Sequence, residues 1–282
     1  MCKFIVCVLV TGMIAVGIST QAALLVDFNA SSGVTSSEGS LVDTWDSAVG
    51  GRQAAPEGGD LARRPSLQGG IFAGGQPGVY FDGADDLLAY SDAGFPSGLS
   101  AFTMAAAFRL GTGISNAAGP MGWGDDRRTN KFEQSGMGRW NNANPTLRHF
   151  TNGGGAASAL SLAEEVNYVG IISQDGTGIY NFTLIDDGVA TSETVDLTGT
   201  ENPNNIVLDT GRIGGIAGPS SGEFGFFIMK GHVGRVQVYD TALTGGDLDS
   251  LVNDLKSYTI PEPNTMALLG LGCLFLGLRR RG

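Results

Sequence analysis

Short segments in which apolar and polar residues alternate, separated by Gly, Asn and Asp, run from Ala23 to Tyr258. In residues 102–110 one face carries Phe102, Met104, Ala106, Phe108 and Leu110. A period of two predicts a strand with one face buried. Residues 180–184 and 235–238 show the same alternation, and further strands are expected near 24–28, 79–81, 87–90, 169–172 and 212–214. Many short strands separated by turn residues predict an all-β sandwich or barrel.

A single helix is expected after these strands. Thr244 and Asp247 form a pair typical of a helix N-terminus, in which Thr244 would cap the first turn. Apolar residues then recur at helical spacing at Leu248, Leu251, Val252 and Leu255. We therefore predict one short C-terminal helix packed against the sandwich.

The N-terminal segment 1–22 is typical of a secretory signal peptide. Lys3 precedes an apolar run over residues 4–18, and Thr20 and Ala22 are small residues at the −3 and −1 positions of a cleavage site. A retained membrane anchor is the alternative, although the apolar run is short for a membrane span.

Residues 259–282 contain three features in a fixed order. Pro261, Glu262 and Pro263 precede an apolar run from Thr265 to Leu278, and Arg279, Arg280 and Arg281 follow it. At about 1.5 Å per residue the apolar run covers about 21 Å, less than the roughly 30 Å of a bilayer core. The segment resembles the PEP-CTERM sorting signal of Gram-negative bacteria. A plain C-terminal anchor is the alternative.

That resemblance implies how the protein is exported and processed. Signal peptidase would act at the N-terminus, and a transient C-terminal membrane helix would hold the chain at the inner membrane. An exosortase-type transpeptidase would then process the tail and leave the protein at the cell surface or outside the cell. The expected organisation is a signal peptide at 1–22, one domain at 23–258 and the sorting signal at 259–282.

Composition narrows the function classes. Between Ala23 and Ile260 there are 13 Lys and Arg residues and 27 Asp and Glu residues, without a clustered basic face, which argues against a nucleic-acid partner. The three cysteines, Cys2, Cys7 and Cys273, all lie in the terminal segments. Disulfides, zinc-thiolate sites and cysteine nucleophiles are therefore excluded from the central domain.

Several short motifs carry a resemblance to a known fold family. Residues 79–87, Val-Tyr-Phe-Asp-Gly-Ala-Asp-Asp-Leu, resemble the "FDG-x-DD" hairpin of laminin G-like domains in the concanavalin A-like superfamily, and residues 186–188 resemble its "vDG" turn. Residues 231–239 resemble the last strand of the family, with Gly234 and Arg235 in place of its acidic pair. The resemblance implies a jelly-roll β-sandwich of the concanavalin A-like kind.

Asp82, Asp85 and Asp86 surround Gly83 in one expected turn. Calcium is bound by several carboxylate and carbonyl oxygens, so Asp82 and Asp85 are candidate ligands, with Asp240 as a more distant third. The alternative is structural, since Asp-Gly is a hairpin signal and Asp side chains bond to the backbone of their own turn. Calcium is the one cofactor that this pattern suggests, and the structural interpretation of the turn is favoured over it.

Two Gly-flanked and Asn-rich segments contain candidate sugar-binding residues. Aromatic ring faces together with amide and carboxylate groups suit carbohydrate recognition. The alternative is that the tryptophans belong to the core. The candidate ligand-binding residues are Trp123, Asp125, Asp126, Trp140 and Asn142.

Catalytic motifs are not apparent. The Glu-x-Asp-x-x-Glu strand of laminarinase-type hydrolases is missing, and Gly218–Gly222 matches a serine-hydrolase motif only by its letters. We therefore expect a non-catalytic binding module for glycans of the matrix or envelope, without enzymatic activity. The alternatives are a structural matrix protein without a specific ligand and a polysaccharide hydrolase.

Overall fold

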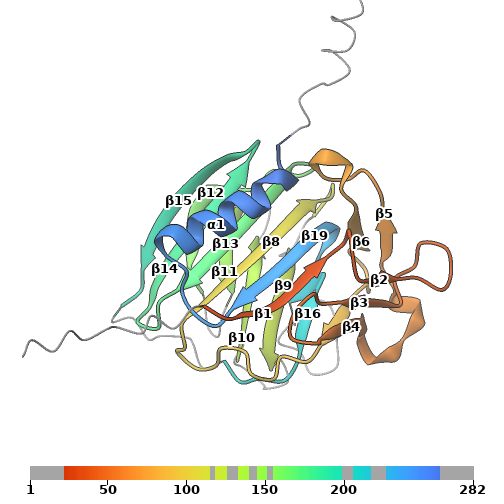
Figure 1. Cartoon of the computed structure of the whole chain (residues 1–282), viewed down its shortest axis with the longest axis horizontal. Coiled ribbons are helices and arrows are strands. Elements are labelled where there is room, and N and C mark those ends of the chain that lie inside the picture. The colour runs from red at the N-terminus through yellow and green to blue at the C-terminus, as the bar shows by residue number, and fades with distance from the viewer. Residues whose placement is uncertain are drawn as a thin grey trace, which may run out of the picture.

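The computed structural model describes residues 22–114, 118–125, 133–139, 145–150, 155–198, 206–216 and 227–260. Two sheets form the layers of a β-sandwich, and helix α1 (Gly245–Leu255) lies outside one of them (Figure 1). The all-β sandwich with a short helix near the C-terminal end, expected from the alternating pattern, is confirmed.

The first sheet has eight strands in the order β15-β14-β13-β8-β19-β6-β5, and β1 also pairs with β19. Neighbouring strands in it are antiparallel. Its strands are β1 (Leu24–Asn29), β5 (Ser66–Gln68), β6 (Gly78–Asp82), β8 (Phe102–Leu110), β13 (Asn167–Gln174), β14 (Ile179–Asp186), β15 (Val189–Asp196) and β19 (Lys230–Tyr239).

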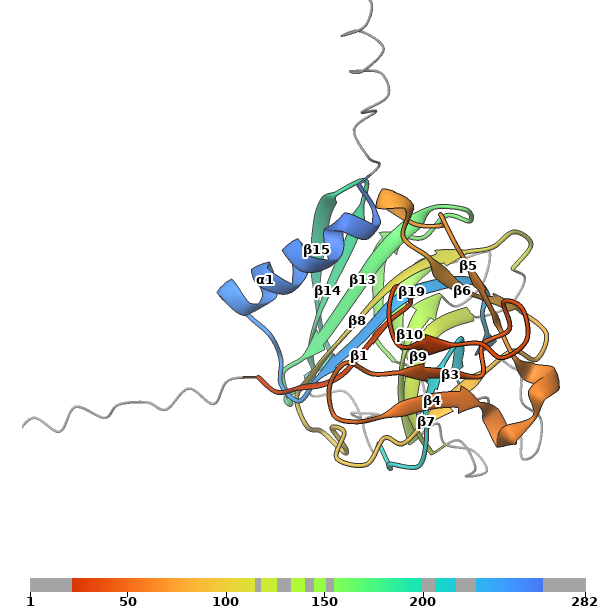
Figure 2. The ribbon, with the colours of Figure 1, turned by 45° about the vertical axis from the view of Figure 1, so that its right-hand side comes forward.

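The second sheet has nine strands in the order β12-β11-β10-β9-β16-β7-β4-β3-β2. Figure 2 shows this sheet as the layer opposite α1. Its strands are β2 (Val34–Thr35), β3 (Thr44–Asp46), β4 (Gln53–Pro56), β7 (Leu88–Tyr90), β9 (Ala118–Asp125), β10 (Glu133–Arg139), β11 (Thr146–Phe150), β12 (Ala157–Ser161) and β16 (Gly211–Ile213). The remaining elements are a two-stranded sheet of β17 (Gly215–Ile216) and β18 (Phe227–Ile228) and the short 3-10 helices η1 (Glu57–Gly59), η2 (Leu61–Arg63), η3 (Ala73–Gly75) and η4 (Lys256–Tyr258).

Strand β8 contributes to both apolar layers of the molecule. Its apolar residues at 102, 104, 106, 108 and 110 belong to the core between the two sheets, as the alternation predicts. Ala105 and Ala107, on its other face, belong to a second apolar cluster with Leu251 and Leu255 of α1. Both faces of β8 are therefore buried, one under the opposite sheet and the other under the helix.

The helix occupies the expected segment, but its N-terminus differs from the prediction. Thr244 is the N-cap residue by position, yet its side chain makes no capping hydrogen bond. The expected capping box is therefore wrong. The packing of Leu251 and Leu255 against the sheet stabilises the helix instead, which agrees with the rule that tertiary contacts supply most helix stability.

Arg235 connects three elements. Its Nε and Nη2 donate to Oδ1 and Oδ2 of Asp27 in β1 at 2.7 and 2.8 Å, and its Nη1 lies 2.8 Å from Oδ2 of Asp254 in α1. Bidentate pairs of this kind are among the stronger hydrogen bonds in proteins. Arg235 thus joins β1, β19 and α1.

Candidate functional site

Four acidic residues lie at one end of the nine-stranded sheet. Asp125 ends β9, Glu133 begins β10, and the two are Cα partners in the antiparallel register. Asp209 precedes β16 and Asp92 follows β7, the next two strands in the order β10-β9-β16-β7. We call these residues, Asp92, Asp125, Glu133 and Asp209, the carboxylate end of the sheet.

Asp92 contacts the backbone at two of the other strand ends. Its Oδ2 accepts hydrogen bonds from the backbone N–H of Asp209 at 3.0 Å and from that of Gly124 at 3.2 Å. Gly124 has a φ of 110°, a left-handed conformation that favours glycine. Because Gly124 immediately precedes Asp125, the Asp92 carboxyl group fixes the backbone at the ends of two neighbouring strands, next to positions 125 and 209.

The environment of Asp92 raises the pKa of its carboxyl group. The residue is 2% exposed. Burial raises the pKa of the Asp92 carboxyl group and the charge of Asp209 acts in the same direction, while the two backbone N–H bonds oppose them. A buried carboxyl group with a raised pKa beside another carboxylate is a feature of acid-base sites. At 2% exposure the Asp92 carboxyl group is out of reach of a ligand, and its two hydrogen bonds position the neighbouring backbone.

The expected role of Trp123 is wrong. Trp123 is 1% exposed, and its Nε1 donates to the carbonyl oxygen of Pro96 at 3.0 Å. Its ring lies edge-on to Phe95 and Phe102, with centroids 5.5 and 5.3 Å away. The alternation of Met121 and Trp123 with glycines places the ring on the core face of β9, where a sugar cannot reach it.

The other candidate sugar-binding residues have different outcomes. Asp125 ends β9 and belongs to the carboxylate end. Asp126, Trp140 and Asn142 lie outside the described residues.

Sequence reasoning missed three members of the carboxylate end, namely Asp92, Glu133 and Asp209. Only the order of strands in the sheet brings residues so far apart together. Among these three, a sequence signal exists for Asp92 alone, because it comes soon after the strand expected at 87–90.

The turn at 82–86 brings three carboxyl groups together. Potential ligand atoms of Asp82, Asp85 and Asp86 lie within 4.8 Å of one another. Oδ1 of Asp82 also accepts from the backbone N–H of Ala84 at 2.7 Å, as the structural alternative requires. Burial raises the pKa of Asp86 to about 6, and the charges of Asp82 and Asp85 contribute to that shift. Calcium at this turn stays a prediction.

Asp240 cannot be a third ligand at that turn. Asp82 is the Cα partner of Lys230, the first residue of β19. Asp240 follows Tyr239 at the other end of the same strand. Ten residues at about 3.3 Å each separate the two by roughly 30 Å. The expected ligand set is corrected to the three residues of the turn itself.

A serine and a histidine form a contact in the core that resembles a nucleophilic pair. Oγ of Ser135 lies 2.6 Å from Nε2 of His149, and both residues are fully buried. Nδ1 of His149 has no hydrogen-bond partner among the described residues, so no described group orients the ring from that side. Burial lowers the pKa of His149 to about 3. Ser135 and His149 thus form a buried contact within the core.

His149 makes the fold sensitive to acid. Its pKa is about 3 in the folded protein and about 6.5 in the unfolded chain, so the unfolded state takes up the proton first. The stability contributed by neutral His149 is present above about pH 6.5 and is lost as the pH falls. Between pH 7 and pH 5 we expect a loss of about 2 kcal/mol in the free energy of unfolding from this residue.

Denaturant titrations at both pH values test this expectation. His149→Phe should lose about 2 kcal/mol less than the wild type between pH 7 and pH 5. Comparing the pH dependence removes any constant cost of the substitution, including the unpaired Ser135. His232, whose pKa burial lowers to about 4, is unchanged in both proteins. An equal loss in both proteins would show that His149 is not buried in its neutral form.

Comparisons with known proteins identify the tail and the fold. Residues 259–281 match the model of the PEP-CTERM protein-sorting motif, so the protein is exported and sorted to the surface. No curated protein matches the chain. Within the described residues, no helix is both long and apolar enough to cross a membrane.

Two solved structures with a similar fold are glycosidases. An arabinofuranosidase complexed with arabinofuranosyl-α-1,2-xylobiose has a TM-score of 0.59 at 12% identity, covering 78% of this chain and 51% of that chain. A sialidase from Trypanosoma rangeli in complex with 2,3-difluorosialic acid has a TM-score of 0.54 at 15% identity, covering 83% of this chain and 33% of that chain. The chain thus spans about half of the first protein and a third of the second.

These two similar structures correct two expectations. The sequence predicts a non-catalytic binding module and no enzymatic activity, on the ground that catalytic motifs are missing. The sandwich is instead similar in fold to part of an arabinofuranosidase and part of a sialidase, both of which are hydrolases. The absence of a local motif is therefore not a reason against the hydrolase alternative.

Proposed function

We propose that the protein is an exported glycoside hydrolase that acts on polysaccharides of the matrix or envelope. The observation that carries the proposal is the carboxylate end, where Asp92 holds the strand ends next to Asp125 and Asp209, and Glu133 pairs with Asp125. The fold of the two glycosidases and the surface-sorting motif support it. Glycoside hydrolysis canonically uses two carboxyl groups, which this end of the sheet can supply.

Asp125 and Glu133 are the pair that we assign to the reaction. Asp125 and Glu133 are Cα partners on adjacent antiparallel strands. Retaining glycosidases hold their two carboxyl groups about 5–5.5 Å apart, whereas inverting enzymes need about 6.5–9.5 Å. The direct pairing of the two positions is our reason for proposing the retaining mechanism. One carboxylate attacks the anomeric carbon while the other protonates the leaving oxygen, and water then releases the sugar with the second residue as base.

The proposal also includes the fold family of the sandwich and the enzymes that would process the two ends of the chain. The motif at 79–87 and the arrangement of two antiparallel sheets support a laminin G-like sandwich of the concanavalin A-like kind. The sorting motif supports an exosortase-type transpeptidase as a processing partner. Signal peptidase would remove residues 1–22, and polysaccharides outside the cell are the substrate class.

A panel of chromogenic glycosides and plant and bacterial polysaccharides tests the proposal. The panel includes an α-L-arabinofuranoside and a sialoside, because these sugars occur in the similar structures. We expect the wild-type protein to release sugar from at least one substrate, and the double variant Asp125→Asn/Glu133→Gln to release none. Asp247→Asn, which changes an exposed carboxylate on α1, is the matched control and should keep full activity.

Two outcomes would contradict the proposal. Failure of the folded wild-type protein on the whole panel would favour the structural matrix protein instead. Full activity of the double variant would place the catalytic carboxylates elsewhere. Circular dichroism of each variant shows whether a loss of activity comes from unfolding.

A further inference from the structure

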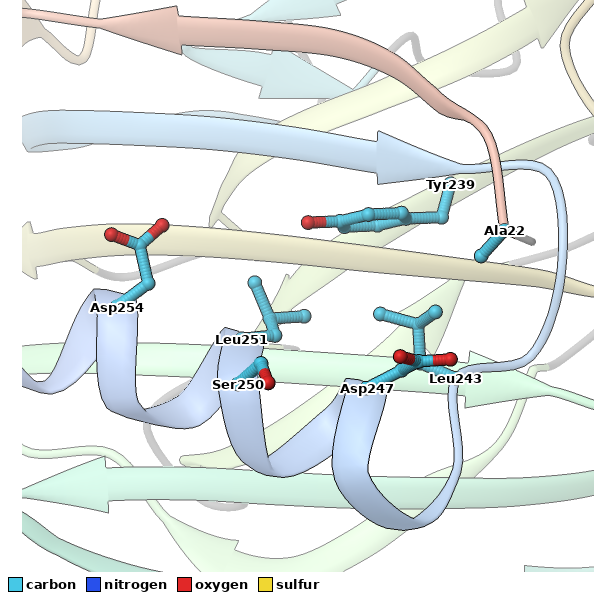
Figure 3. A pocket seen from close by; sticks show the side chains of 7 residues that line it. All are labelled: Ala22, Tyr239, Leu243, Asp247, Ser250, Leu251 and Asp254. Atoms are coloured by element: carbon cyan, nitrogen blue, oxygen red, sulfur yellow. The ribbon is translucent and has the colours of Figure 1, made fainter.

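A cavity of about 310 Å³ lies between α1 and the end of β19, and none of the four residues of the carboxylate end lines it. Figure 3 shows the ring of Tyr239 and the side chain of Ala22 on one side of it, and residues of α1 on the other. The remaining lining residues are Leu243, Asp247, Ser250, Leu251 and Asp254.

The start of β1 is fixed beside this cavity. The backbone N–H of Ala23 donates to Oδ1 of Asp240 at 2.9 Å. In return, the backbone N–H of Asp240 donates to the carbonyl oxygen of Ala23 at 3.1 Å. The backbone bond continues the β1–β19 pairing by one residue, and the side-chain bond gives the nitrogen of Ala23 a defined position against a carboxylate.

One carboxylate contacts that nitrogen and two more line the cavity. Asp240, which follows β19, is the contact, while Asp247 and Asp254 come from α1, and Asp254 lies at the end of the cavity away from Ala22, paired with Arg235. No lysine or arginine side chain forms an ion pair with Asp240 or Asp247 in the part of the chain that the structure describes. A positive charge at the nitrogen of Ala23 would thus meet a carboxylate at hydrogen-bond distance.

The sequence places a cleavage site at the same position. Thr20 and Ala22 are the small residues at −3 and −1, so the bond between Ala22 and Ala23 is the expected point of cleavage. Hydrolysis adds the hydroxyl of water to the carbonyl of Ala22 and a proton to the nitrogen of Ala23. The amide N–H that now meets Asp240 then becomes an α-amino group, which is largely protonated at neutral pH.

We propose that Asp240 is the acceptor for the mature N-terminus, binding the α-ammonium group of Ala23 that signal-peptide cleavage creates. Ala22 leaves with the signal peptide, and the cavity beside Tyr239 opens on that side. The pair joins the first residue of the mature chain to the strand that leads into α1. This inference is independent of the proposed hydrolase activity.

The first test is the N-terminal sequence and intact mass of the protein exported by its host. We expect the mature chain to begin at Ala23. A mature chain that begins at any other residue, or that keeps residues 1–22, would overturn the proposal.

The second test titrates the α-amino group by NMR on the chain beginning at Ala23. An adjacent carboxylate raises the pKa of an amine, so Asp240→Asn should lower the pKa of the α-amino group by about one unit. The amide of this variant keeps a hydrogen-bond acceptor, and thermal melting checks its fold. Asp249→Asn removes an exposed carboxylate of α1 that does not line the cavity, and should leave the pKa unchanged.

A second chain that begins at Ala22 separates the pair from a general charge effect. Its α-amino group is one residue away from the nitrogen that contacts Asp240, so Asp240→Asn should change its pKa much less. Equal effects of Asp240→Asn and Asp249→Asn on the chain beginning at Ala23 would overturn the proposal.

Discussion

Replacing Trp123 with alanine is expected to lower the free energy of unfolding by about 4 kcal/mol, because truncating a buried aromatic side chain removes its burial and leaves a cavity. Trp123 is 1% exposed and contacts the rings of Phe95 and Phe102 in the core of the sandwich. Its Nε1 also donates to Pro96, which fixes the segment that follows β7. Chemical denaturation of the wild-type protein and the variant measures the difference.

Two control variants accompany this measurement, one for the hydrogen bond and one for an exposed apolar side chain. Trp123→Phe keeps a ring in the core but loses the bond to Pro96, so it should cost less than the alanine variant. Leu61→Ala removes an apolar side chain that is 60% exposed and should change stability by less than about 0.5 kcal/mol. A loss below about 1 kcal/mol in Trp123→Ala would mean that the ring is at the surface, where a sugar can reach it.

Replacing Arg235 with alanine is expected to lower the free energy of unfolding by about 3 kcal/mol. Removing one partner of a largely buried ion pair leaves the other charge without compensation, which typically costs about 3–5 kcal/mol. Here the side chain of Asp27 is 12% exposed and would be left unpaired, while that of Asp254 is 50% exposed and can be hydrated. The expected loss is therefore at the lower end of that range.

A double-mutant cycle tests this explanation. If the unpaired carboxylate causes the loss, then Arg235→Ala/Asp27→Ala should be less destabilised than the sum of the two single variants. Lys256→Ala is the control, because the Nζ of Lys256 donates to the exposed Asn253 and the substitution should cost less than about 1 kcal/mol. Additive single effects in the cycle would contradict a coupled pair.

The strands and the helix were predictable because burial imposes a regular period on the sequence. The alternation in 102–110 placed β8 correctly, and the spacing of Leu248, Leu251 and Leu255 placed α1. Trp123 was not predictable from its Gly-rich surroundings. Glycines next to a tryptophan suggest a loop, whereas here they alternate with core residues along a strand.

The carboxylate end shows why a site can escape analysis of the sequence. Asp92 and Asp209 are 117 positions apart and meet only because β7 and β16 are neighbours in the sheet. No local motif encodes that pairing. The acidic turn at 82–86 is the opposite case, because its three carboxyl groups are close in sequence and remain close in space.

The most direct test of the proposed hydrolase activity is the configuration of the sugar released by the wild-type protein, followed by proton NMR from the first minutes of the reaction. We expect hydrolysis with retention, because Asp125 and Glu133 are direct partners across β9 and β10. Release of the inverted sugar would contradict this pair as the catalytic residues. Absence of hydrolysis by the folded protein would contradict the assignment as a glycoside hydrolase.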